Sequence, residues 1–192
     1  MGTLIAKLSQ KQRSFPIGLS GLTGMGYLLT GGISPLSRNQ GLAIDQFLRV
    51  EGFWGSGSPF NLSKPNKSST EKEKIEWKGL CGAAPFLGIV TKIRLKTQEL
   101  NPLIVFQAAV DPCQLAICIQ QAENWPNSGS LQWIWNEGIT IYAIFEIDNY
   151  TSENKIQSII NKLPFSKKYF IKKIAGLYQL PPLEIPKKLK KG

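Results

Sequence analysis

The sequence predicts an α+β fold, and composition and element order both point to that class. Apolar residues make up 42% and charged residues 19% of the 192 residues, which is the composition of a chain that folds around a core. The second half contains the order strand, helix, hairpin and helix, which is typical of helices packed on an antiparallel sheet. No stretch approaches the roughly 20 apolar residues of a membrane-spanning helix, so we expect no membrane span.

The first half is predicted to contain short elements separated by turns. Residues 2–12 can form a helix that Phe15 and Pro16 end, and residues 42–54 can form a strand. Six glycines between Gly18 and Gly32 disfavour a regular helix there and favour tight turns with positive φ. The rest is expected to be an exposed polar loop over residues 56–74, a bend over residues 79–88 and a strand over residues 89–95.

The second half carries clearer signals. Residues 103–110 are predicted to form an apolar strand. Asp111 can cap a helix that extends to about residue 124, with Pro112 at its first position and Gln114 at the capping-box position. Residues 131–135 and 139–147 flank a three-residue connection that ends in Gly138, which predicts a hairpin. Ser152 can cap a last helix with an apolar face of Ile156, Ile159, Ile160 and Leu163.

Residue types that are missing exclude several kinds of chemistry. The sequence has no histidine, which removes histidine-based acid–base catalysis, histidine metal ligands and histidyl-linked cofactors. The three cysteines, Cys81, Cys113 and Cys118, have no CxxC spacing and an odd number, so we expect buried free thiols and no metal site.

The positive charge is concentrated near the C-terminus. The formal net charge is +10, and residues 162–191 contain nine lysines against the single acid Glu184. Such a region could contact nucleic acid or another anionic surface by counterion release. However, the run of lysines over Lys187–Lys191 has no arginine and no interleaved aromatic residues, so a dedicated nucleic-acid role is disfavoured. Residues 187–192 are predicted to form a basic tail.

The glycine-rich segment over residues 21–38 is the most informative part of the chain. Free backbone amides can bind an anion, and glycine lets a cofactor approach them closely. The segment matches neither GxGxxG after a strand nor GxxxxGK[ST], so it supports neither a Rossmann nor a Walker site. Its glycine content alone leaves an irregular structural loop and a ligand cradle both open.

Four pieces of sequence appear in the order found in a known family. Residues 2–16 resemble the family's helix and turn, and residues 23–32 (TGMGYLLTGG) resemble its threonine–glycine run. Residues 36–45 (LSRNQGLAID) resemble the LSRxxGLxxD continuation of that run. Residues 77–91 resemble a strand entry that ends in GIVT. Together they resemble the FAD-binding PCMH-type flavoproteins, the vanillyl-alcohol oxidase and berberine-bridge-enzyme relatives. Cys81 stands where that family usually has arginine.

The resemblance implies an FAD cofactor, bound non-covalently because the chain lacks histidine. Thr23, Gly24 and Gly26 would meet the pyrophosphate or ribityl region. Gly31, Gly32 and Ile33 would lie close to it, and the backbone of Ile89 and Val90 would meet another part of the cofactor. The family reaction is hydride abstraction from a carbon that bears an alcohol or an amine.

The resemblance also divides the chain. Residues 1–98 would be the second subdomain of a PCMH-type FAD-binding domain, residues 99–186 part of a substrate lobe with an antiparallel sheet and flanking helices, and residues 187–192 the tail. The first FAD subdomain would come from a separate partner chain, and the substrate would be a small molecule. A non-catalytic remnant or subunit of such an enzyme is the alternative, and we expect a cytoplasmic location.

No catalytic residue can be assigned from the sequence. Tyr142, Glu137 and Glu146 could face a flavin from the substrate lobe, although a tyrosine on a strand is more often an ordinary sheet residue. Trp133 and Trp135 share one face of a strand, which indicates core or interface. Arg38 is expected to pair with Asp45.

Overall fold

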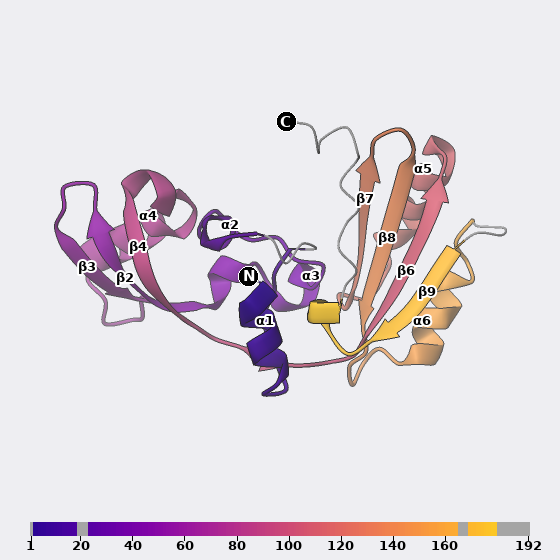
Figure 1. The fold of residues 1–192 in the computed structure, drawn as a ribbon, viewed down its shortest axis with the longest axis horizontal. Coiled ribbons are helices and arrows are strands. Elements are labelled where there is room, and N and C mark those ends of the chain that lie inside the picture. The colour runs from indigo at the N-terminus through magenta and orange to yellow at the C-terminus, as the bar shows by residue number, and fades with distance from the viewer. Residues whose placement is uncertain (1, 19–22, 165–168, 180–192) are drawn as a thin grey trace. The chain divides into compact units, whose positions relative to one another are not determined.

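The computed structural model describes residues 2–18, 23–164 and 169–179, and it divides into two compact units (Figure 1). Unit 1 comprises Met1–Ser37 and Gly41–Glu99. Unit 2 comprises Arg38–Gln40 and Leu100–Gly192. Three residues from the first half of the sequence therefore belong to the second unit.

Unit 1 is built around a three-stranded antiparallel sheet. Its strand order is β3-β2-β4, with β2 at Phe47–Trp54, β3 at Pro59–Ser63 and β4 at Gly88–Leu95. The long helix α4, Glu71–Leu87, packs against β3 and β4 and contributes buried Trp77, Leu80 and Ala84 to the core. The remaining elements are α1 (Gly2–Ser9), β1 (Arg13–Ser14), α2 (Met25–Leu29), the 3-10 helix η1 (Ala43–Gln46) and β5 (Gln98–Glu99), and β5 pairs with β1.

Three expectations for unit 1 were wrong in part. The predicted loop over residues 56–74 contains β3 and the start of α4, and the predicted bend over residues 79–88 lies mostly inside α4. Thr70 explains the helix start, because its hydroxyl accepts from the Glu73 amide and the Glu73 carboxylate accepts from the Thr70 amide. A break does occur within α4 at Gly82, which has φ +117°. The glycine-rich stretch expected to lack a helix contains the five-residue α2.

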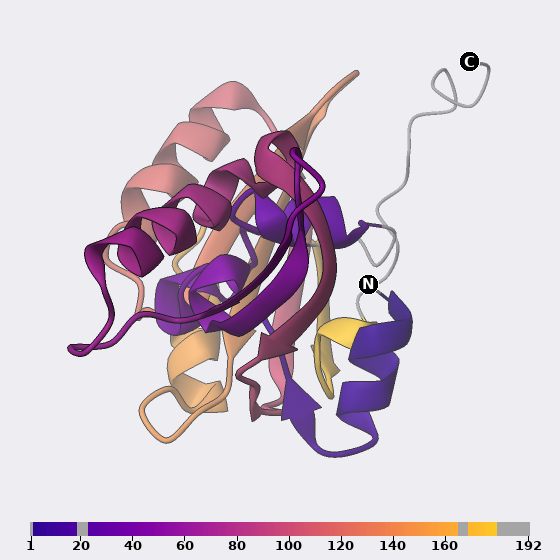
Figure 2. The ribbon, with the colours of Figure 1, turned by 90° about the vertical axis from the view of Figure 1, so that its left-hand side faces the viewer.

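Unit 2 is a four-stranded antiparallel sheet with helices on one face, as predicted (Figure 2). The strand order is β7-β8-β6-β9, and the two helices are α5 (Pro112–Ala122) and α6 (Glu153–Ile160). The strands are β6 (Leu103–Val110), β7 (Gly129–Trp135), β8 (Ile139–Glu146) and β9 (Tyr169–Ile174). Strand β9 was not predicted. The remaining described elements are the short helices α3 (Ser37–Gln40) and η2 (Leu177–Gln179).

The core of unit 2 lies between the sheet and its helices. Phe106 of β6 and Ile141 and Phe145 of β8 are completely buried there, together with Cys118 of α5 and Ile156 of α6. Alternation along each strand sends the neighbouring side chains to the opposite, helix-free face. We call that face the open face. It is set by the same period-2 pattern that predicted the strands.

Among the described residues, none of the helices is both long and apolar enough to cross a membrane.

Candidate functional site

The glycine-rich segment of unit 1 presents backbone to solvent at its beginning. Gly24 precedes α2 and Gly26 lies inside it, and both residues are exposed. A Cβ atom added to either glycine would meet no heavy atom within 4 Å. Nothing in the packing of the described residues of unit 1 therefore requires glycine here, while the open space admits a ligand close to the backbone.

The end of the same segment has a clear packing role. Gly31 and Gly32 have φ of +125° and +72°, and their carbonyls accept hydrogen bonds from Ile44 and Ala43 of η1 at 3.1 Å and 3.0 Å. A Cβ on Gly32 would lie 2.5 Å from that of Ala43. Glycine at residue 32 is therefore explained by its contact with η1, whether or not a ligand is bound.

Tyr27 supports the turn between these two parts. Its ring lies against Gly18, and its hydroxyl donates to the carbonyl of Ile33, whose own side chain is 63% exposed. Burial raises the pKa of the Tyr27 phenol above its usual value. Tyr27 is thus a structural residue that leaves Ile33 free to contact a ligand.

The predicted cofactor residues Ile89 and Val90 lie at the start of β4, which is an edge strand in the described sheet. Helix α4 links them to the glycine-rich segment, because it packs against both α2 and β4. Ile89 is 71% exposed and Val90 is half-buried. The structure thus carries all eight predicted residues on two segments of unit 1 that contact a common helix.

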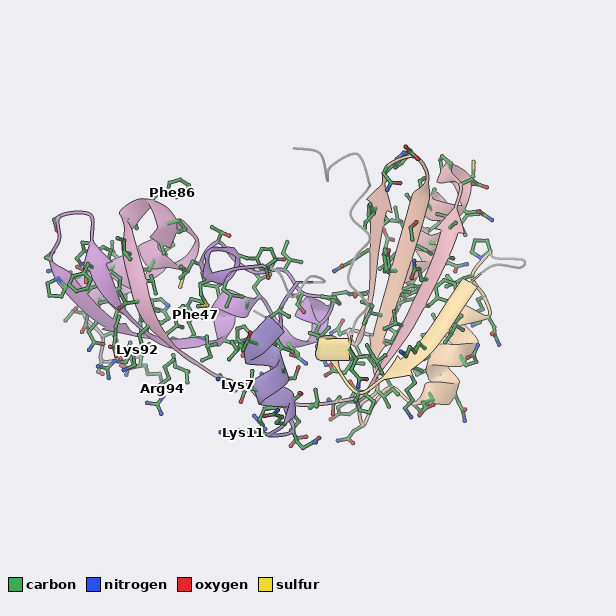
Figure 3. The ribbon with its side chains drawn as sticks, viewed as in Figure 1. Lys7, Lys11, Phe47, Phe86, Lys92 and Arg94 are labelled. Atoms are coloured by element: carbon green, nitrogen blue, oxygen red, sulfur yellow. The ribbon has the colours of Figure 1, made fainter. Side chains whose placement is uncertain are left out.

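An apolar strip surrounds Ile89. Ile89 pairs across the sheet with Phe53, and the chain before it contributes Leu87 and Phe86. Phe86 is 86% exposed, and its ring projects away from the end of α4 (Figure 3). Exposed apolar side chains that gather in this way are typical of an interaction surface. We call Phe53, Phe86, Leu87 and Ile89 the apolar strip.

The far half of β4 is basic instead of apolar. Lys92 and Arg94 project from β4 on the same face, which Figure 3 shows. Lys92 lies 3.6 Å from the Glu51 carboxylate, and Arg94 stands opposite Arg49 in the register of β2 and β4. An exposed ion pair of this length adds little stability, so the half-strand mainly contributes positive charge.

The cysteines differ from the prediction of three buried thiols. All three are free, but only Cys118 is buried, whereas Cys81 is half-buried and Cys113 is exposed. Burial raises the pKa of the Cys118 thiol to about 11. For Cys81, burial raises the pKa most, the Asp45 carboxylate raises it further, and Lys64 opposes both. No cluster of metal-ligating side chains occurs in the part of the chain that the structure describes.

Tyr142 lies in the middle of the open face of unit 2. The sheet register places it directly between Gln107 of β6 and Gln132 of β7, and all three side chains are half-buried. These neighbours offer amide donors and acceptors on both sides of the phenol. Sequence reasoning missed the two glutamines, although alternation in each predicted strand places them on the face of Tyr142 once the register is known.

Glu146, another candidate, is not an accessible acid. It is 1% exposed, and its carboxylate accepts from Asn39 Nδ2 at 2.9 Å, from Gln40 Nε2 at 2.9 Å and from Asn101 Nδ2 at 3.1 Å. The third candidate, Glu137, is exposed in the hairpin turn. Burial and three donors give Glu146 a structural role.

Two further expectations were wrong. Arg38 does not pair with Asp45: its guanidinium donates to the carbonyls of Ala122 and Gly129 at 3.0 Å each and of Trp125 at 3.3 Å. Asp45 instead accepts from the Leu42 amide at 2.9 Å. Trp133 and Trp135 are 45% and 64% exposed, so they do not form core. An interface role for them stays a prediction.

Most of the basic C-terminal region, including the tail over residues 187–192, lies outside the described residues. Of its lysines, the structure describes Lys162, Lys172 and Lys173, and Lys173 forms an ion pair with Glu153. Nothing in this part favours binding to nucleic acid.

Comparison with known proteins gives a consistent result. No family model matches the chain. Two curated proteins do: the FAD-linked oxidoreductase janO of Penicillium janthinellum, 30% identical over 123 residues, and the FAD-linked oxidoreductase nodO of Hypoxylon pulicicidum, 34% identical over 101 residues. By sequence, the chain is therefore similar to FAD-linked oxidoreductases. The matched regions cover 64% and 52% of this chain but 26% and 21% of those proteins, so it spans about a quarter of their length.

Solved structures of such oxidoreductases show the same fold. The chain aligns over its whole length with the berberine-bridge-enzyme-like protein 1 of Physcomitrella patens at a TM-score of 0.76 and 16% identity, and covers 44% of that chain. A chitooligosaccharide oxidase aligns with 92% of this chain at a TM-score of 0.73 and 17% identity, and 38% of that chain is covered. The resemblance to vanillyl-alcohol oxidase and berberine-bridge-enzyme relatives is therefore confirmed, together with the α+β class.

Proposed function

We propose that this chain forms part of an FAD-dependent oxidoreductase that removes a hydride from an alcohol- or amine-type substrate. The observation that carries the proposal is the similarity to two FAD-linked oxidoreductases, and the exposed glycines of the glycine-rich segment add to it. The cofactor would be held non-covalently by two short segments, whose residues are Thr23, Gly24, Gly26, Gly31, Gly32, Ile33, Ile89 and Val90.

The chemistry of these residues fits a large, mostly neutral binding surface for FAD. Gly24 and Gly26 leave space next to the backbone, and a threonine hydroxyl such as that of Thr23 can hydrogen-bond a phosphate oxygen. Ile33 and Ile89, at 63% and 71% exposure, provide apolar contact for a ring system. Gly32 would act indirectly, by holding the end of the segment on η1.

The substrate would contact the open face of unit 2 around Tyr142. Oxidation of an alcohol or amine removes a hydride from carbon and a proton from the attached oxygen or nitrogen. Bound FAD would supply the hydride acceptor, and the proton would pass to water. Tyr142, Gln107 and Gln132 would hydrogen-bond the oxygen or nitrogen and orient it. Two structural relatives are oligosaccharide oxidases, a chitooligosaccharide oxidase and a xylooligosaccharide oxidase, which supports a sugar hydroxyl as one form of the alcohol.

A separate chain that carries the other FAD subdomain is the partner we propose. The apolar strip supports this, because Phe86 and Ile89 are largely exposed next to the proposed cofactor residues. We also retain the domain assignment of residues 1–98 to FAD binding, 99–186 to the substrate lobe and 187–192 to a tail. A cytoplasmic location stays a prediction.

The cofactor site is tested by titrating FAD into the chain and measuring the quenching of flavin fluorescence. Gly26→Leu places a side chain in the open space without a clash, so we expect the fold to persist and FAD affinity to fall about tenfold or more. Gly138→Leu in the hairpin turn is the matched control, because a Cβ there also meets nothing within 4 Å. Equal affinity of both variants would contradict the assignment of Gly26.

A further inference from the structure

The three residues Arg38–Gln40 form a clip that is part of unit 2, although the chain on both sides of them belongs to unit 1. Arg38 donates to three carbonyls, those of Ala122, Trp125 and Gly129, which lie at the end of α5 and in the connection to β7. Asn39 and Gln40 both donate to the carboxylate of Glu146. The clip thus bonds to two separate parts of unit 2.

Glu146 binds the clip at the end of β8. Its carboxylate is almost fully buried, and among the described residues it forms no ion pair with a lysine or arginine. Its carboxylate accepts hydrogen bonds from the side-chain amides of Asn39, Gln40 and Asn101. A buried carboxylate is costly unless its oxygens accept hydrogen bonds. The loss of these donors would therefore strongly destabilise the packing of the clip against the rest of unit 2.

The clip also bears on the open face. Glu146 and Tyr142 are four residues apart on β8, so they share that face at a spacing of about 13 Å. Around Glu146 the face is buried, with Leu103 at 1% and Ile144 at 0% exposure. Around Tyr142 the side chains are half-buried or exposed. The clip therefore sits at the closed end of the face and leaves the Tyr142 end accessible.

We propose that Glu146 is a positioning residue: it anchors the Arg38–Gln40 clip and thereby fixes the end of the strand that carries Tyr142. The importance of Tyr142 rests on the proposed function, but the anchor itself does not depend on FAD. Failure of the chain to bind FAD would overturn the proposed function, whereas the anchoring of the clip by Glu146 would still be tested by the experiment below.

Hydrogen–deuterium exchange of the full chain without FAD, read by mass spectrometry, tests the anchor. Asn39→Asp places a second carboxylate beside Oε2 of Glu146, and we expect exchange in residues 122–130 and 140–148 to become about tenfold faster. The same substitution at the exposed Asn61 of β3 is the matched control and should leave these segments unchanged.

A complementary substitution separates the specific contact from general damage. Oε1 of Glu146 receives Gln40 and Asn101, whereas Oε2 receives Asn39. In the double variant Asn39→Asp with Glu146→Gln, the new amide at residue 146 can donate to the new carboxylate at residue 39, while its oxygen still accepts from the other two residues. We expect protection to return to within about threefold of the original chain. If Asn39→Asp leaves exchange unchanged, or if the double variant exchanges as fast as Asn39→Asp, the anchor is refuted.

Discussion

At residue 32, both the backbone conformation and the packing require glycine. It has φ +72°, and an added Cβ would lie 2.5 Å from the Cβ of Ala43. Gly57→Ala is a matched control, because Gly57 has φ +85° but open space around it. We expect Gly57→Ala to lower the free energy of unfolding by about 1 kcal/mol and Gly32→Ala by about 2–4 kcal/mol in urea denaturation, the excess being the steric clash. Equal losses would show that the contact with η1 is unimportant.

The cysteines should differ strongly in their reaction with a thiol reagent. Thiolate is the reactive form, and burial raises the pKa of Cys118 to about 11 and raises that of Cys81 as well. We expect exposed Cys113 to react first, Cys81 more slowly and Cys118 only as the chain unfolds, when labelling at pH 8 is followed by peptide mass spectrometry. Fast labelling of Cys118 in the folded chain would contradict its burial.

At the residue scale the sequence could not reveal which polar partners meet across long separations. Arg38 and Asp45 are seven residues apart and of opposite charge, which made their pairing the local choice. Arg38 instead reaches carbonyls more than 80 residues away. Glu146 likewise could be placed on a strand, but its donors at residues 39 and 40 depend on the tertiary fold.

Helix α4 begins at a capping box that can be tested by pH. The backbone amide and hydroxyl of Thr70 hold the pKa of the Glu73 carboxyl below its ordinary value. A depressed pKa means that folding favours the charged form of Glu73, so its carboxylate stabilises the folded chain at pH values above the usual glutamate pKa. This stabilisation is lost as the pH falls through the lower pKa of the folded state. We expect NMR titration to show the Glu73 pKa below its ordinary value, and Thr70→Ala to raise it part of the way back, because the hydroxyl is lost while the backbone amide remains. An unchanged Glu73 titration in Thr70→Ala would contradict the capping box.

The predictability of each element followed the strength of its local signals. The strand over residues 103–110, the helix that Asp111 caps and the hairpin around residues 136–138 combined alternation or helical spacing with caps and turn residues, and all three are present. Helix α4 was missed because two glycines and Pro85 within it read as a bend, and one of them, Gly82, does break the helix. Strand β9 was missed because its lysines follow a lysine-rich stretch, which hid the strand pattern.

At the scale of the whole chain, the apolar strip predicts self-association. Phe86, Ile89 and Phe53 are 86%, 71% and 49% exposed, and burial of such side chains is favourable. We expect light scattering after size-exclusion chromatography to show oligomers, and Phe86→Ser with Ile89→Ser to shift them toward monomer. Tyr150→Ser in unit 2, also 87% exposed, is the control. A monomer without dye-binding apolar surface would contradict this use of the strip.

The resemblance to the family could be recognised from the sequence because four short motifs occur in the family's order over about ninety residues. Both FAD-linked relatives support that resemblance, whereas the two solved structures described above are 17% and 16% identical and support the architecture alone. The cofactor residues follow from the motifs and not from the fold. For this reason the assignment of FAD to the chain needs a direct measurement.

An absorbance spectrum of the purified chain with added FAD, after removal of unbound flavin, is that measurement. We expect a flavin band near one FAD per chain, and we expect the flavin to leave the protein on denaturation because the sequence has no histidine to link it. A chain that stays colourless with excess FAD would contradict autonomous flavin binding by the glycine-rich segment and β4.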